Sequence, residues 1–101
     1  MKLVQIFLPV RDNRGKRFSR TIYAEVRREL IGRFGGLTAY SRAPARGLWR
    51  SPRGNRSDDI VIFEVMAPRL DARWWRAYRR WLERRFRQDK LLVLVQDVRS
   101  L

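Results

Sequence analysis

Cysteine and histidine are both missing from this chain of 101 residues. Without cysteine, the protein has no disulfide and no thiolate to act as a nucleophile or ligand. Without histidine, it lacks the most common general base and metal ligand near neutral pH. We therefore expect neither a metal nor a cofactor, and the sequence shows no nucleophile–base pair and no pair of carboxylates at a useful spacing.

Long hydrophobic runs are also missing. No apolar run approaches the ~20 residues that a membrane-spanning helix needs, and the start of the chain lacks the small-residue cleavage site of a signal peptide. We expect a cytoplasmic protein without a membrane span. The length predicts a single domain over residues 1–101, and a hydrophobic content of 45% is ordinary for a globular fold.

Acidic residues are scarce, with 10 against 24 basic ones, and the formal net charge is +14. All but three of the basic residues are arginines. This surplus favours an anionic partner, either nucleic acid or a phosphorylated ligand. Residues 11–17 are one basic stretch, read either as an anion-binding loop or as a solvated connection. Alternatively, the net charge of the whole chain reflects a bias in composition, and the basic side chains only form a solvated surface.

Alternating or continuous apolar residues predict strands over residues 3–8, 37–43, 59–66 and 91–95. Pro44 interrupts the second strand, which residues 48–49 resume. A proline inside a strand points to a sheet edge or a bulge. Residues 51–57 are rich in turn formers and predict a hairpin loop.

Two helices separate these strands. The first runs from an N-cap at Ser19 to Phe34, with an apolar stripe along one side. Gly35 and Gly36 follow it, either as a helix C-cap or as a place where the backbone approaches a ligand. The second helix begins at an N-cap, Asp71, and ends near residue 86. It carries aromatic residues on one face and arginines on the other: Arg73, Arg76, Arg80, Arg84 and Arg87.

The order of these elements is β-α-β-β-α-β, which predicts a ferredoxin-like α+β fold. Right-handed crossovers then give an antiparallel sheet in the order 4-1-3-2, with both helices on one face. The predicted strands 1, 3 and 4 are apolar on both sides, and soluble monomers rarely leave such a face uncovered. We therefore expect a homodimer that pairs the open sheet faces, as in dimeric α+β barrels.

Polar residues interrupt the open face at Gln5, Glu64 and Gln96. If they approach one another across neighbouring strands, Glu64 lies in an apolar interface that raises its pKa and suits it to act as an acid or base. The alternative is that Glu64 pairs with an arginine or hydrogen-bonds to a glutamine at the dimer seam.

The arginine face of the second helix offers a binding hypothesis instead. Arginines can contact the phosphates of RNA or DNA. The aromatic side chains of this helix lie on the opposite side, which is typical of a core-facing surface. In this hypothesis the arginine face therefore contacts the phosphates, and the aromatic side chains of the helix do not stack on bases.

Short motifs resemble those of a family of small bacterial proteins of unknown function: a Phe-x-x-Gly-Leu-Thr step, a Gly-x-Trp step and a helix ending in Arg-Phe-x-Gln. Here they correspond to residues 34–38, 47–50 and 84–88, with the Phe-to-Gly spacing one residue shorter. The resemblance implies a ferredoxin-like fold that pairs as a dimer, and no known activity. The ligand-binding candidates that it implies are Thr38, Tyr40, Trp49 and Gln88.

The sequence favours a non-enzymatic, homodimeric structural or small-ligand-binding module. Its ligand-binding candidates are Gln5, Thr38, Tyr40, Trp49, Glu64 and Gln88. Two alternatives stay open. One is an RNA- or DNA-binding protein that uses the arginine helix face, and the other is a cofactor-free enzyme with Glu64 as acid or base.

Overall fold

The computed structural model describes the backbone of residues 1–51 and 54–101, and within these the side chains of residues 1–41 and 59–101. The chain runs through β1 (Lys2–Pro9), α1 (Arg20–Phe34), β2 (Thr38–Ser51), β3 (Gly54–Ala67), α2 (Ala72–Arg85) and β4 (Val93–Asp97). In this described part, four strands form one antiparallel sheet in the order β2-β3-β1-β4. The predicted element order and the 4-1-3-2 sheet are confirmed.

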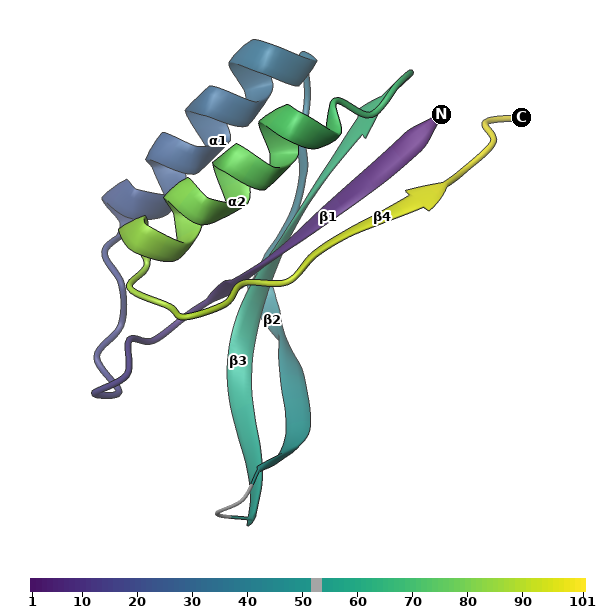
Figure 1. The fold of residues 1–101 in the computed structure, drawn as a ribbon. Helices are drawn as coiled ribbons and strands as arrows, with labels where there is room; N and C mark the ends of the chain where they lie inside the picture. The colour runs from purple at the N-terminus through teal and green to yellow at the C-terminus, as the bar shows by residue number, and fades with distance from the viewer. Residues whose placement is uncertain (52–53) are drawn as a thin grey trace.

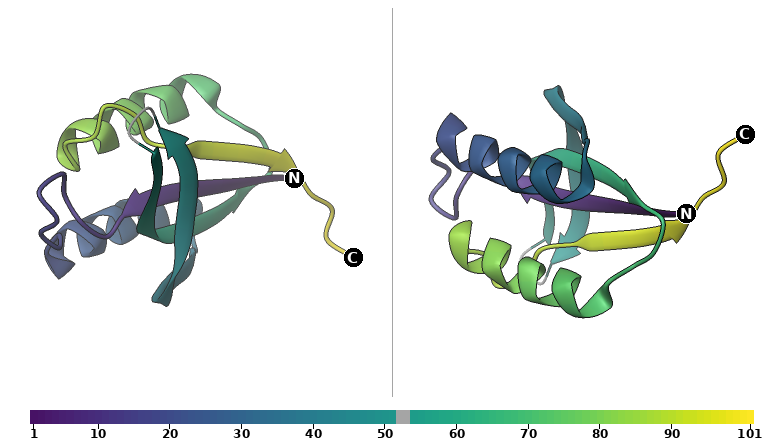
Figure 2. Two further views of the ribbon diagram at one scale, coloured as in Figure 1. Left: turned by 90° about the horizontal axis from the view of Figure 1, so that it is seen from below. Right: turned by 90° about the horizontal axis from the view of Figure 1, so that it is seen from above.

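Both helices lie on one face of the sheet and leave the other face open (Figure 1). Two further views agree, with the strands in front of the helices from below and behind them from above (Figure 2). None of the described helices is long and apolar enough to cross a membrane.

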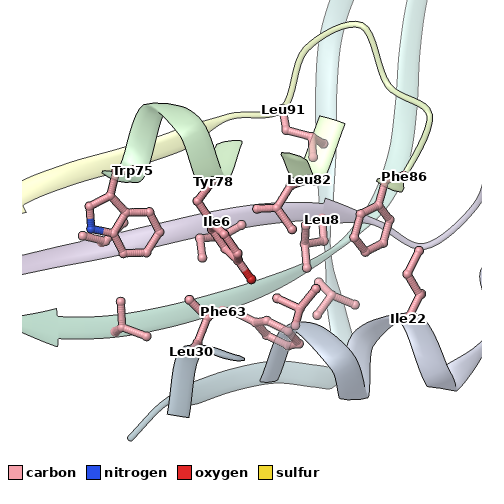
Figure 3. Packing of buried hydrophobic residues seen from close by; sticks show 14 of the residues in the cluster. Ile6, Leu8, Ile22, Leu30, Phe63, Trp75, Tyr78, Leu82, Phe86 and Leu91 are labelled. Carbon is pink, nitrogen blue, oxygen red and sulfur yellow. The ribbon is translucent and has the colours of Figure 1, made fainter. Parts of the chain in front are cut away.

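The core fills the space between the helices and the sheet (Figure 3). Strand alternation sends every second side chain of β1 and β3 to this side, where Ile6 and Phe63 are fully buried. The helices contribute Val26, Leu30 and Leu82, which are also fully buried. The apolar stripes predicted for the two helices are therefore core-facing, as expected.

β2 and β3 are longer than predicted. Their register shifts between Tyr40 and Ala45, so Pro44 lies in a β-bulge on an edge strand, in agreement with the sequence. Beyond the bulge the pairing continues until Ser51 meets Gly54, and the two strands run on past β1 (Figure 1). The predicted loop over residues 51–57 is therefore wrong for Ser51, which ends β2, and for the residues from Gly54 onward. Pairing with a neighbouring strand outweighs their poor β-propensity.

β4 begins two residues later than predicted. Leu91 is buried outside the strand, and its backbone N–H donates to the Glu83 carboxylate at 3.0 Å. A side chain from α2 thus satisfies the donor that a sheet partner would otherwise bind. The strand ends at Asp97 and includes Gln96, which the sequence placed just beyond it.

The helix ends follow the predicted signals with one difference. Gly35 adopts the left-handed conformation with φ of 81°, and its N–H donates to Ile31. The Asp71 carboxylate accepts from the Trp74 N–H at 3.1 Å, as an N-cap does. Ser19 occupies the N-cap position of α1, but its side chain makes no capping hydrogen bond.

Candidate functional site

The open face of the sheet carries the polar cluster that the sequence predicts. Strand alternation places Gln5 on this face, and the register puts it directly opposite Glu64 on β3. Glu64 in turn faces Thr38 on β2. Tyr40 lies one pleat further along the same face. Three neighbouring strands therefore bring together four of the predicted ligand-binding candidates.

Hydrogen bonds fix the Glu64 carboxylate within this cluster. The Gln5 side-chain amide donates to Oε2 at 2.6 Å, and the Tyr40 hydroxyl donates to Oε1 at 3.3 Å. Glu64 therefore bonds to a glutamine, one of the two alternatives to a catalytic role that the sequence left open. A carboxylate offers about four lone-pair sites, so each oxygen keeps capacity for a further donor.

Glu64 is the only charged residue among the open-face positions with described side chains. Its neighbours on that face include Leu3, Met66 and Leu94. Met66 and Leu94 are 58% and 44% exposed, so apolar surface borders the carboxylate. Gln96 lies opposite Leu3 and shares this face.

A surface hollow of about 340 Å³ adjoins Glu64 at the end of α1. Its walls include Leu3, Thr38 and Met66 from the sheet and the backbone of Gly35 and Gly36. No atom lies within 4 Å of where a Cβ on either glycine would stand, so this wall has open space in front of it. The hollow thus combines a carboxylate, a hydroxyl side chain, apolar side chains and exposed main chain.

Two predicted site residues lie elsewhere. Gln88 follows α2, and its side-chain amide donates to the Phe86 carbonyl at 3.1 Å, away from the open face. The backbone of Trp49 pairs with Arg56 beyond the bulge, but its side chain lies outside the described residues. The structure therefore does not bring Gln88 together with Glu64.

The arginine face of α2 is exposed along its whole length. Four of the predicted arginines lie on this face: Arg73, Arg76, Arg80 and Arg84. The prediction is wrong for Arg87, because α2 ends at Arg85 and Arg87 follows it in the left-handed conformation with φ of 52°. Within the described part of the chain, no carboxylate comes within 4.0 Å of the guanidinium groups of the four arginines on α2. The nearby carboxylates have other partners, since Glu83 lies 3.9 Å from Arg79 and Glu25 lies 2.9 Å from Arg85. The four positive charges on α2 are available to an external anion.

The basic loop at residues 11–17 uses its one carboxylate internally. Asp12 accepts from the backbone N–H groups of Arg14 and Lys16, both at 2.9 Å. The bond from Lys16 is the main cause that lowers the pKa of Asp12. Asp12 therefore stays ionised as a turn acceptor and leaves the basic side chains of the loop facing solvent.

Sequence reasoning missed a second hollow, of about 520 Å³, near the start of α1. Arg17, Arg20, Tyr23 and Arg27 line it. The spacing of the last three along α1 was the available signal, because residues three and four apart share a helix face. Among the described residues, no group of three acidic side chains is placed to hold a metal ion.

Comparison with known proteins gives structural neighbours only. No family model matches the chain, so the resemblance noted in its motifs is not tested, and no curated protein matches either. Among solved structures, a phage SAM lyase in complex with S-methyl-5′-thioadenosine aligns with a TM-score of 0.62 at 15% identity, covering 95% of this chain and 80% of the lyase. A phage SAM lyase in the apo state aligns with a TM-score of 0.61 at 13% identity, covering 94% and 78%. These likenesses establish a shared fold.

Proposed function

We propose that this chain is a small-ligand-binding module whose ligand occupies the hollow beside Glu64 on the open sheet face. The observation that carries the proposal is the Glu64 carboxylate, held by Gln5 and Tyr40 at the edge of that hollow. Binding sites are typically apolar concavities with a few fixed polar groups, and this arrangement has both components.

The ligand that best suits the site is a nucleoside thioether or its positively charged sulfonium relative. A carboxylate can accept hydrogen bonds from ribose hydroxyls, as in dinucleotide sites. It also attracts a cation, and Glu64 is the only charge on the described open face. A protein with this fold binds S-methyl-5′-thioadenosine. This structural similarity is the reason for choosing S-methyl-5′-thioadenosine as the ligand to test.

The test is calorimetric titration of the wild-type protein with S-methyl-5′-thioadenosine and, separately, with S-adenosylmethionine. A hydrogen bond to a charged group contributes about 1.5–3 kcal/mol, so Glu64→Gln should weaken binding by roughly tenfold or more. Asp89→Asn is the matched control, because Asp89 is exposed and outside the site. Equal affinity of the wild type and Glu64→Gln, or saturable binding of neither compound, would contradict the proposal.

The same titration addresses the enzymatic alternative. If Glu64 acts as an acid or base, S-adenosylmethionine should be consumed over hours, and chromatography of the mixture would reveal the products. Glu64→Gln should abolish that turnover while Asp89→Asn retains it. An unchanged ligand after prolonged incubation leaves binding without catalysis.

We also propose that a second copy of the chain covers the open face, as in dimeric α+β barrels. Met66, Leu94 and Tyr40 are 58%, 44% and 49% exposed on this face, while the helices cover only the opposite one. Apolar surface left open in this way favours association. A second copy over the face would also shield the Glu64 hollow from water.

The exposed arginine face of α2 favours a second candidate function, the binding of RNA or DNA. Binding to a labelled RNA and a DNA duplex should fall steeply between about 50 and 200 mM salt if several phosphates are contacted. The triple variant at Arg76, Arg80 and Arg84, each changed to Ala, should then lose most of the affinity and reduce the salt slope. A control that changes Arg28, Arg69 and Arg99 to Ala removes the same charge elsewhere. Equal losses in both variants would indicate only a general charge effect.

A further inference from the structure

The hollow near the start of α1 is built mainly from arginine and aromatic side chains. Arg20, Tyr23 and Arg27 reach it from successive turns of the helix, and Arg17 reaches it from the preceding segment. Val10 and Val61 of the core form an apolar wall. Its volume of about 520 Å³ is in the range of small-molecule pockets, about 300–1,000 Å³.

No described residue that lines this hollow is acidic. Within the described part of the chain, Arg17, Arg20 and Arg27 also form no ion pair. Three positive charges thus share one concave surface, and no described residue of its lining supplies a counter-charge. Repulsion among like charges is unfavourable in a partly desolvated site, and a bound anion would relieve it.

Of the three arginines, Arg27 has the greatest need for a negatively charged partner, because it is half-buried whereas Arg17 and Arg20 are exposed. Its guanidinium carbon lies 5.9 Å from the centre of the fully buried Phe63 ring. Contact with a ring compensates only part of the loss of water around a cation, and a partly buried charge otherwise calls for a partner of opposite sign. The ring also limits the directions in which Arg27 can point.

The other described groups that line the hollow add no negative charge. The Tyr23 hydroxyl donates to the Pro9 carbonyl at 2.5 Å, which fixes the ring as a wall. Burial raises the pKa of Tyr23, so the hydroxyl stays neutral. The first turn of α1 has no acidic residue, so the positive end of the helix adds to the same field.

We propose that this hollow binds the phosphoryl group of a phosphorylated small molecule. Arginine suits this role because its planar guanidinium donates two parallel hydrogen bonds to phosphate oxygens. The site is separate from the one beside Glu64. The two hollows share no described lining residue: α1 contributes Arg20, Tyr23 and Arg27 to the first and Phe34, at its end, to the second.

The experiment titrates the full chain with inorganic phosphate, pyrophosphate and adenosine 5′-monophosphate. We expect saturable binding that weakens by about tenfold or more in the double variant Arg20→Gln and Arg27→Gln, because charged hydrogen bonds are lost. The matched control is Arg69→Gln with Arg99→Gln, two exposed arginines outside every proposed site, which removes the same charge and should change the affinity by less than about twofold. Equal weakening in the two double variants would overturn the proposal, as would the absence of saturable binding.

Two further arms keep the test decisive. If Arg27→Gln impairs folding, Arg17→Gln replaces it in the test. Arg17 is exposed and lies before α1, so this change should weaken phosphate binding without disturbing the core. A single-stranded oligonucleotide without terminal phosphates distinguishes the source of the phosphoryl group, and binding of this probe alone would overturn the proposal. Titration of the same variants with S-methyl-5′-thioadenosine tests the Glu64 site separately, so failure of either proposal leaves the other standing.

Discussion

Tyr78 is a buried polar side chain with an unsatisfied hydroxyl. It extends from α2 into the core toward Phe63 (Figure 3), and 6% of its surface is exposed. Within the described part of the chain its hydroxyl has no hydrogen-bond partner. Burial, the main cause, and the negative charges of Glu29 and Glu25 raise the pKa of Tyr78. The unsatisfied hydroxyl therefore lowers the stability of the folded state.

Tyr78→Phe should raise the free energy of unfolding by about 1 kcal/mol, because it removes an unsatisfied buried group and keeps the ring. Denaturant unfolding measures this change. Tyr23→Phe is the contrasting variant. It loses the hydrogen bond to the Pro9 carbonyl, so we expect it to lower stability by about 1 kcal/mol. A destabilised Tyr78→Phe would show that the hydroxyl has a partner.

The raised pKa of Tyr78 also predicts an effect at alkaline pH. The folded state holds the phenolic proton more tightly than the unfolded state, whose value is near 10.0. This contribution to stability is complete below that pH and is lost as the pH rises above it. Tyr78→Phe should therefore lose less stability above pH 10 than the wild type in parallel unfolding titrations.

The two glycines after α1 differ in what they require. Gly35 has φ of 81°, whereas Gly36 has no such conformation, and a Cβ at either position meets nothing within 4 Å. Gly35→Ala should cost about 1–2 kcal/mol through backbone strain alone. Gly36→Ala should be nearly neutral for stability, as thermal unfolding will show. If Gly36→Ala also weakens ligand binding, the exposed backbone there contacts the ligand.

At the scale of elements, the two helix N-termini are built differently. The Asp71 side chain accepts from the Trp74 N–H, while the Ser19 side chain caps nothing. Asp71→Ala should lower the free energy of unfolding by about 1 kcal/mol, and Ser19→Ala should leave it nearly unchanged. Comparable losses in the two variants would indicate that Ser19 caps α1 in solution.

The whole molecule has one covered and one open sheet face. If a second copy covers the open face, light scattering after size exclusion should give twice the monomer mass. Met66→Asp with Leu94→Asp should return a monomer, because it would bury two unpaired charges at the interface. Ile31→Asp is the control, since Ile31 is 47% exposed on a helix. A monomeric wild type, or a mass other than that of two chains, would contradict the proposal.

Much of the architecture could be predicted from the sequence. The alternation through residues 3–8 and 59–66 identified strands with Ile6 and Phe63 in the core. The helices, the cap at Asp71, the turn at Gly35 and the sheet order were predicted as well. These features depend on local periodicity and local backbone preference, which a single stretch of chain contains. The same alternation placed Gln5 and Glu64 on one face.

The tertiary structure decided what depends on partners distant in the sequence. Pairing with β2 keeps Gly54 and Asn55 in a strand, and the contact with Glu83 holds Leu91 outside β4. The hollow around Arg27 forms only where α1, the end of β1 and the bulge of β2 meet. Hydrogen-bond ladders and concave surfaces arise from elements packed together, and no local pattern in the sequence encodes which groups will face each other there.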